Sequence, residues 1–272
     1  MKAASREALA GVESTLDKIL GESTAVAVAA QTGLELFEVV DVLDGERELR
    51  ADLSDAAASE DTRKKLVADL FGGKVAPSTQ QVLEAAASAK WSTGRDLVRG
   101  LVALGRRSLL RGAEFEGKLG QVEDELFRLS RILDREGELT QLLSDRTAKS
   151  AKKRGLLANV LYGKVTMFTE ALALQAIGRP EQNPIDDVAN LASLAAKLQG
   201  REVAHVVSAG ELNEGQQAVL AEKLGKIYGR AMSIHSEVDT SLLGGMTIRV
   251  GDEVIDGSTA GKISRMRASM AK

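Results

Sequence analysis

An internal repeat of ninety residues constrains the fold of this 272-residue chain more than any other feature of its sequence. When the chain is shifted against itself by ninety positions, residues 36–79 align with residues 126–169 without a gap. Leucine and alanine coincide easily by chance, but turn residues in register do not, so the repeat predicts one structural unit present twice. The recurring groups include Leu36-Phe37 with Leu126-Phe127, Leu43-Asp44 with Leu133-Asp134, Leu53-Ser54-Asp55 with Leu143-Ser144-Asp145, and Gly73-Lys74-Val75 with Gly163-Lys164-Val165.

The composition favours helices in both copies. Aromatic residues make up 3% of the chain, and three prolines leave long stretches without helix breakers. Apolar stripes at helical spacing recur on successive segments that are joined by short links, which is the pattern of an up-and-down bundle. We predict two tandem up-and-down helical bundles, over residues 1–90 and 91–198, with Ser59 and Thr93 as helix caps.

The pattern changes after Gly200. Residues 202–209 and 232–238 are typical of strands, and residues 213–228 between them are typical of a helix. A hairpin and a final helix complete the chain. The predicted fold class is therefore mostly α: two bundles followed by a small α/β domain of order β-α-β-β-α over residues 199–272.

Bulk properties exclude several classes of function. The net charge of −3 selects neither nucleic acid nor an anionic membrane as a partner, and aromatic residues for base stacking are nearly absent. The absence of cysteine removes disulfides, thiol catalysis and zinc-thiolate sites. No apolar run approaches the roughly 18 residues needed to span a bilayer. We expect a soluble protein that associates with membranes only through a partner.

The glycine-rich stretch 242–264 carries the strongest local signal. Met246, Ile248 and Val250 alternate with polar residues before a turn at Gly251-Asp252, which predicts a β-hairpin. Gly257, Gly261 and Lys262 resemble fragments of a phosphate-binding loop, but the glycine spacing and the residue after the lysine do not match that motif. A hairpin followed by a capped helix is the favoured interpretation, and an anion site at Lys262 stays as an alternative.

Other candidate sites have ordinary structural explanations. His205 and His235 lie within predicted strands, where two ligands fall short of a metal site; we expect partly exposed side chains, with His235 toward solvent. The basic run Lys149–Arg154 and the cluster at Arg106, Arg107 and Arg111 indicate either an acidic partner or a solvated face. Acid pairs at 60–61, 186–187 and 252–253 are expected at helix starts and in a turn. We expect no catalytic, metal or cofactor residues.

The hairpin stretch also resembles the C-terminal signature of the δ subunit family of F-type ATP synthases, called the oligomycin-sensitivity-conferring protein in mitochondria. The matching residues are Leu243, Gly244, Gly245, Ile248, Gly251, Asp252, Val254, Ile255, Asp256, Gly257 and Ser258.

This resemblance implies a non-catalytic peripheral-stalk (stator) subunit on the cytoplasmic face of the bacterial cell membrane. Relatives have a six-helix bundle that binds N-terminal helices of α subunits on the α3β3 head, and a C-terminal domain that holds the b or b-prime-like subunits. The resemblance implies one copy per complex and a monomer when isolated. A helical adaptor unrelated to ATP synthesis is the alternative.

The extra bundle departs from the family plan. Ordinary bacterial members have one bundle, and the enlarged form is associated with actinobacterial enzymes. Because the second bundle adjoins the domain with the signature, we expect it to bind the α-subunit helix through apolar anchors. The predicted seat is a groove among Leu97, Leu101, Val165, Phe168 and Leu172.

Overall fold

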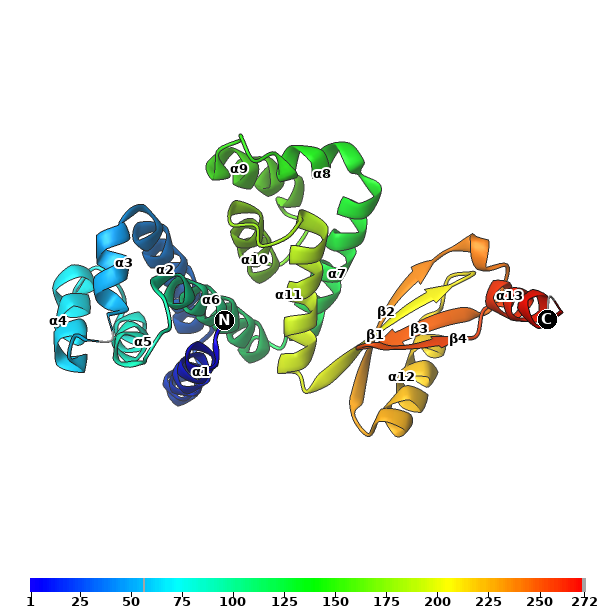
Figure 1. Cartoon of the computed structure of the whole chain (residues 1–272), viewed down its shortest axis with the longest axis horizontal. Coiled ribbons are helices and arrows are strands. Elements are labelled where there is room, and N and C mark those ends of the chain that lie inside the picture. Colours follow the sequence, from blue (N-terminus) through cyan, green and yellow to red (C-terminus); the bar gives the residue numbers. More distant parts are fainter. Residues whose placement is uncertain (56, 271–272) are drawn as a thin grey trace.

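A computed structural model describes residues 1–55 and 57–270 of the chain. Within these residues, eleven helices, α1 to α11, precede a small sheet domain at the C-terminal end, and the parts follow one another along the long axis of the molecule (Figure 1). The predicted fold class, helical bundles followed by a small α/β domain, is confirmed.

The first bundle is built from short-linked helices, two of which start at a predicted side-chain cap. The predicted cap Ser59 accepts a hydrogen bond from the Thr62 backbone N–H at 3.2 Å, and Thr93 does the same for Asp96 at 3.1 Å. Its helices are α1 (Ala3–Ser23), α2 (Val26–Gly45), α3 (Arg47–Leu53), α4 (Glu60–Phe71), α5 (Pro77–Ser88) and α6 (Gly94–Phe115).

The second bundle repeats this order ninety residues later, beginning again with α6. One predicted helix, from residue 114 to 133, starts later than expected. Gly117 takes a left-handed conformation with φ of 72°, and the Lys118 N–H bonds back to the Ala113 carbonyl at 2.7 Å, which ends α6. The further helices are α7 (Leu119–Arg135), α8 (Gly137–Ser144), α9 (Ser150–Leu161), α10 (Met167–Gly178) and α11 (Pro184–Leu198).

Helix α6 contributes to the cores of both bundles. Its first half places Leu97, Leu101 and Leu104 in the first core, and its second half places Leu109 and Ala113 in the second. An apolar side chain that is fully buried contributes about 1.5–3 kcal/mol. Both bundles therefore depend on one continuous helix, and neither can tilt independently unless α6 bends.

A duplicated hydrogen-bond motif joins the second and fifth helices of each copy. Glu35 on α2 accepts bonds from the Ala76 N–H at 2.8 Å and the Thr79 hydroxyl at 2.5 Å. Ninety residues later, Glu125 on α7 accepts from the Thr166 N–H at 2.9 Å and from Thr169 at 2.6 Å. Each carboxylate accepts a hydrogen bond from one free backbone N–H at a helix start, where negative charge is favoured.

The C-terminal domain has its own core. Strand β1 pairs in parallel with β2 and antiparallel with β3, and β4 pairs antiparallel with β3, in the order β2-β1-β3-β4. The predicted hairpin supplies both β3 and β4, and α12 packs beside the sheet (Figure 1). The elements are β1 (Arg201–Ser208), α12 (Glu214–Tyr228), β2 (Ala231–Val238), η1 (Thr240–Leu242), β3 (Met246–Val250), β4 (Glu253–Asp256) and α13 (Thr259–Met270).

Candidate partner-binding surfaces

The side chains predicted to seat a partner helix do not line one groove. Leu97 and Leu101 are buried in the first core, whereas Phe168 and Leu172 are buried in the second. Val165 is partly buried against the second core. The apolar periodicity on which the prediction rested therefore marks core positions, and any partner must contact other residues on these helices.

Helix α2 covers the groove between α6 and α10, the first and fifth helices of the second bundle. Ala30 belongs to the second core, and Val26 and Phe37 pack against it. The approach is close because two glycines face each other: a Cβ atom on Gly105 would lie 2.5 Å from the Phe37 ring and 3.1 Å from the Gly33 carbonyl oxygen. The Ser108 hydroxyl also donates to the Ala29 carbonyl at 2.7 Å. This groove is filled from within the chain.

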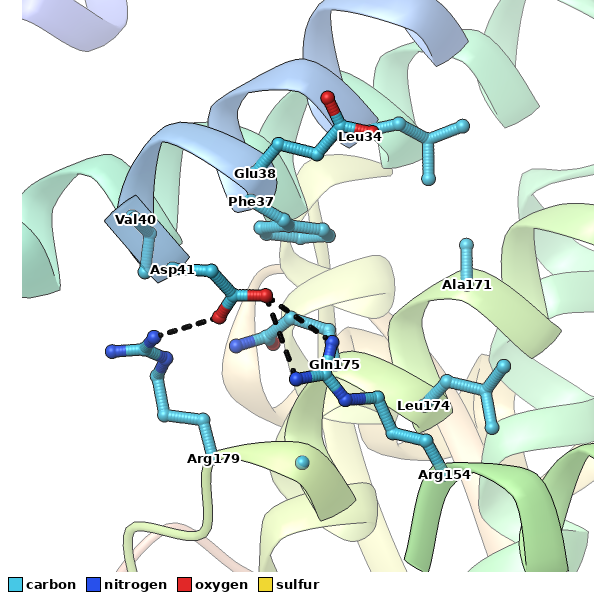
Figure 2. A pocket seen from close by; sticks show the side chains of 11 residues that line it. Leu34, Phe37, Glu38, Val40, Asp41, Arg154, Ala171, Leu174, Gln175 and Arg179 are labelled. Atoms are coloured by element: carbon cyan, nitrogen blue, oxygen red, sulfur yellow. Dashed lines mark hydrogen bonds and ion pairs between the residues drawn. The ribbon is translucent and has the colours of Figure 1, made fainter. Parts of the chain in front are cut away.

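Figure 2 shows the open end of this seam, where a cavity of about 280 Å³ separates α2 from α10. Phe37 and Asp41 both project from α2 into the cavity, and Asp41 reaches between Arg154 on α9 and Arg179 at the end of α10. The Asp41 carboxylate is 3.4 Å from Arg154 and 3.1 Å from Arg179. The basic run 149–154 thus finds one acidic partner inside the molecule.

The second basic cluster is also paired internally. Arg107 and Arg111 on α6 donate to the Asp17 carboxylate on α1, at 2.5 and 2.9 Å for the shorter contacts. Burial acts to raise the pKa of Asp17, but these hydrogen bonds outweigh it and lower the pKa to about 2. Arg106 donates to the Gln175 side chain at 2.8 Å. The cluster fastens α1 and α10 to α6.

The corresponding groove of the first bundle, between α1 and α5, is open. It has a volume of about 570 Å³, and its walls consist mainly of small side chains. Glu7 and Lys90 add charge to a surface that is otherwise apolar or weakly polar. The lining residues are Ala4, Glu7, Ala8, Gly11, Val12, Thr15, Ala85, Ser88, Ala89 and Lys90.

The ninety-residue repeat relates the open groove to the filled one. Gln175, Gly178 and Arg179, which line the seam under α2, are the counterparts of Ala85, Ser88 and Ala89 in the open groove. Gly105, which meets Phe37, is the counterpart of Thr15. The chain therefore contains the same groove twice, once with a helix in it.

The glycine-rich signature forms a hydrogen-bonded turn that caps α13. The Asp256 carboxylate accepts from the Ser258 N–H at 2.9 Å, and the Ser258 hydroxyl accepts from the Gly261 N–H at 3.0 Å, which caps α13. A side chain on Gly261 would collide with Asp256, which explains the glycine there. Because a carboxylate already lies at this helix start, the site repels an anion, and the alternative of an anion site at Lys262 has no geometric support.

The prediction that His235 faces solvent is wrong. Its side chain is 3% exposed and packs against α7, with its ring stacked on Phe127 at a centroid distance of 4.3 Å. Alternation along a strand separates two faces but does not show which face another domain covers. His205 pairs with His235 across β1 and β2, and among the described residues no three side chains of metal-ligating type gather.

Exposed apolar side chains gather in the last segment of the chain. Leu243 after η1 is 71% exposed, Val254 on the edge strand β4 is 52% exposed, and Met266 on α13 is 63% exposed. Single exposed apolar residues are normal, but several on consecutive elements beside an open sheet edge favour a partner surface. In the described ranges 1–55 and 57–270, no helix has the length and apolar character needed to cross a bilayer.

Three acidic residues whose hydrogen bonds connect different helices or domains were not predicted from the sequence. Glu35 and Glu125 had a signal, because they occupy the same position of the repeat beside the matching Leu36 and Leu126. Glu123 had none, since its counterpart in the first copy is Gly33.

Comparison with known proteins follows the same division of the chain. The profile of the ATP synthase delta (OSCP) subunit family matches residues 107–270, a range that begins within α6 and leaves α1 to α5 outside the match. A protein of Corynebacterium aurimucosum named ATP synthase subunit delta is 76% identical over 271 residues, with all of both chains covered. The proteins of the same name from Corynebacterium diphtheriae and Corynebacterium kroppenstedtii are 64% and 52% identical, again over the full length of both chains.

Among solved structures, a chain of the mitochondrial ATP synthase hexamer of Toxoplasma gondii aligns with 61% of this chain and 95% of its own length. The identity is 17% and the TM-score 0.38, which is too low to support an argument about this chain.

Proposed function

The chain belongs to the ATP synthase delta (OSCP) subunit family, and on that premise we propose that it is the peripheral-stalk subunit of an F-type ATP synthase. In this role it links the catalytic α3β3 head to the b subunits and resists rotation of the head while protons drive the rotor. It makes and breaks no bond itself. Family membership argues against the alternative of a helical adaptor unrelated to ATP synthesis.

The open groove between α1 and α5 is the proposed seat of the α-subunit N-terminal helix. The observation that carries this assignment is the filled groove of the second bundle, where α2 already lies against α6 and α10. A partner helix cannot enter that seam without displacing α2 from a core to which it contributes. The predicted seat in the second bundle is therefore replaced by its counterpart in the first.

Helix α2 also indicates the chemistry of the expected occupant. Its contact stripe runs through Val26, Ala30, Gly33 and Phe37, at spacings of four, three and four residues, and continues to Asp41. This is the i, i+4, i+7, i+11 pattern of a helix that docks through one apolar face. The small residues lining the α1/α5 groove favour an amphipathic helix that presents one or two larger apolar side chains.

The C-terminal domain is proposed to hold the b or b-prime-like subunits. Leu243, Val254 and Met266 supply exposed apolar surface beside the edge strand β4. In this arrangement residues 1–90, 91–198 and 199–272 act in series from the head to the b subunits. The chain is monomeric when isolated, is present in one copy per complex, and is held at the cytoplasmic face of the membrane through its partners.

Calorimetric titration with a synthetic peptide of the α-subunit N-terminus tests the groove. Gly11→Trp fills the groove, yet a Cβ atom at Gly11 meets nothing within 4 Å, so the bundle itself is undisturbed. We expect binding by the unmodified chain and its loss in Gly11→Trp. The matched control is Gly21→Trp, on the same helix with equally open space but outside the groove, which retains binding.

Undiminished binding by Gly11→Trp would exclude the α1/α5 groove and return the site to the second bundle. The stator role itself is tested separately by purification of the complex from membranes through a tag on this chain. Co-purification of α and b subunits is expected. Their absence from a correctly folded tagged chain would contradict the proposed function.

A further inference from the structure

A polar ladder joins the second bundle to the C-terminal domain. Glu123, Phe127 and Arg131 are spaced by four residues along one face of α7, and Ser233, His235 and Glu237 are spaced by two along β2. Four helical residues rise about 6 Å and two strand residues about 6.8 Å, so the two rows stay in register. The contacts are Ser233 and His235 with Glu123, Phe127 with His235, and Arg131 with Glu237.

Glu123 is the centre of this ladder. Its side chain is 2% exposed, and its carboxylate lies 2.9 Å from His235 Nε2, within hydrogen-bond distance of the Ser233 hydroxyl, and 3.2 Å from Gln199 Nε2. A buried carboxylate is costly unless it is fully hydrogen-bonded. Ser233 and His235 lie on β2, so Glu123 keeps only Gln199, at the end of α11, when the domain is not seated.

The covalent link between the second bundle and the C-terminal domain allows more than one orientation of that domain. The chain passes from α11 to β1 through Gly200, which has φ of 70° and open space around it. Among the residues that the structure describes, the core of the C-terminal domain, which contains Val206, Leu224 and Ile248, includes no bundle residue. The domain can therefore change its orientation without losing its own core, whereas the two bundles share α6.

We propose that Glu123 is a positioning residue that fixes the orientation of the C-terminal domain on the second bundle. It holds β2 against α7, and without it the folded domain reorients about Gly200. This assignment rests on the geometry of the isolated chain and does not depend on the proposed function. In a stator it would set the direction in which the stalk leaves the head.

Pulsed electron-spin resonance on the full chain tests the proposal. The sequence has no cysteine, so Lys152→Cys on α9 and Lys223→Cys on α12 take spin labels at exposed positions on either side of the joint. The parent chain is expected to give one narrow distance distribution. Glu123→Ala is expected to give a broad distance distribution. Glu123→Gln, which retains an acceptor oxygen, is expected to give a distribution nearly as narrow as that of the parent.

The matched control is Glu125→Ala on the same helix, whose carboxylate caps α10 and does not contact β2. It is expected to lower the melting temperature and leave the distance narrow. A second variant, His235→Ala, removes a partner from the other side and should broaden the distribution like Glu123→Ala. The proposal is overturned if both joint variants keep the narrow distance, or if Glu125→Ala broadens it equally while circular dichroism shows folded chains.

Discussion

The same face of the second helix docks the next domain in both copies of the repeat, with different chemistry. In α2 this face carries Gly33, Phe37 and Asp41, and it packs on the second bundle. In α7 the counterparts ninety residues later are Glu123, Phe127 and Arg131, and they pack on the C-terminal domain. Only the phenylalanine is shared.

The difference shows how one helical unit makes two kinds of joint. At the first joint, glycines bring two helices into close contact, and the partners share α6. At the second, a buried carboxylate is hydrogen-bonded across an interface whose covalent link is a glycine. Close packing excludes alternative geometries, whereas a hydrogen-bonded contact can be released as a unit. We therefore expect rigidity between the bundles, and an orientation of the sheet domain that stays fixed only while Glu123 is hydrogen-bonded across the interface.

The largest expected effect comes from blocking the close approach at the first joint. Gly105→Leu places a side chain where the Phe37 ring and the Gly33 carbonyl already lie, and we expect a loss of about 3 kcal/mol in the free energy of unfolding. Urea denaturation followed by circular dichroism measures it. Gly155→Leu on α9, where a Cβ meets nothing within 4 Å, is the control and should be neutral or slightly stabilising. Equal effects of the two would mean that the glycine contact is unimportant.

The next effect concerns the ion pairs that fasten α1 to α6. Asp17 and Arg107 occupy the same position of the repeat, and they pair because α1 and α6 pack side by side. Asp17→Asn should cost about 1–2 kcal/mol in the free energy of unfolding, because two arginines lose their charged acceptor. Urea denaturation at neutral pH provides the measurement.

The pH dependence of that variant sharpens the test. The pKa of Asp17 is about 2 in the folded chain, below the ordinary value near 3.9 of an unfolded aspartate, so the unfolded chain binds the proton more tightly. The stabilisation of the folded chain by ionised Asp17 is complete above about pH 4 and is lost as the pH falls from about 4 toward 2. Over this range the stability of Asp17→Asn should fall less than that of the parent. Parallel pH curves would contradict the assignment.

Much of this architecture follows from sequence, and the two errors about candidate site residues share one physical cause. Caps such as Ser59 and Thr93, the hairpin and the duplication are encoded by local residue types or by register. The use of α6 by two cores depends instead on what lies on each side of a helix, and periodicity marks Leu97 and Phe168 alike as buried without assigning them to a core. His235 fails for the same reason, because a second domain covers its face of the strand.

A smaller effect compares the two capping carboxylates. Glu35→Gln and Glu125→Gln each remove a charged acceptor from the start of a fifth helix, and each should cost about 1 kcal/mol in the free energy of unfolding. Burial acts to raise the pKa of Glu125, but hydrogen bonds from Thr169 and Thr166 outweigh it and lower the pKa. The contribution of Glu125 to the free energy of unfolding is therefore lost only as the pH falls below the ordinary pKa of a glutamate. Thermal denaturation should show one shared transition in both variants, because α6 joins the cores. Separate transitions for the two bundles would contradict a single unit.

The smallest expected effect is the loss of an exposed ion pair at the first joint. Arg154 and Asp41 are 40% and 50% exposed, and Arg179 continues to hold Asp41 when Arg154 is removed. A double-mutant cycle of Arg154→Ala and Asp41→Ala should give a coupling energy of about 0.2–0.5 kcal/mol that declines with added salt. A coupling above about 1 kcal/mol would mean that charge, and not the contact of Gly33 with Gly105, holds the bundles together. The comparison between a packed joint and a hydrogen-bonded joint would then fail, because both would depend on polar pairs.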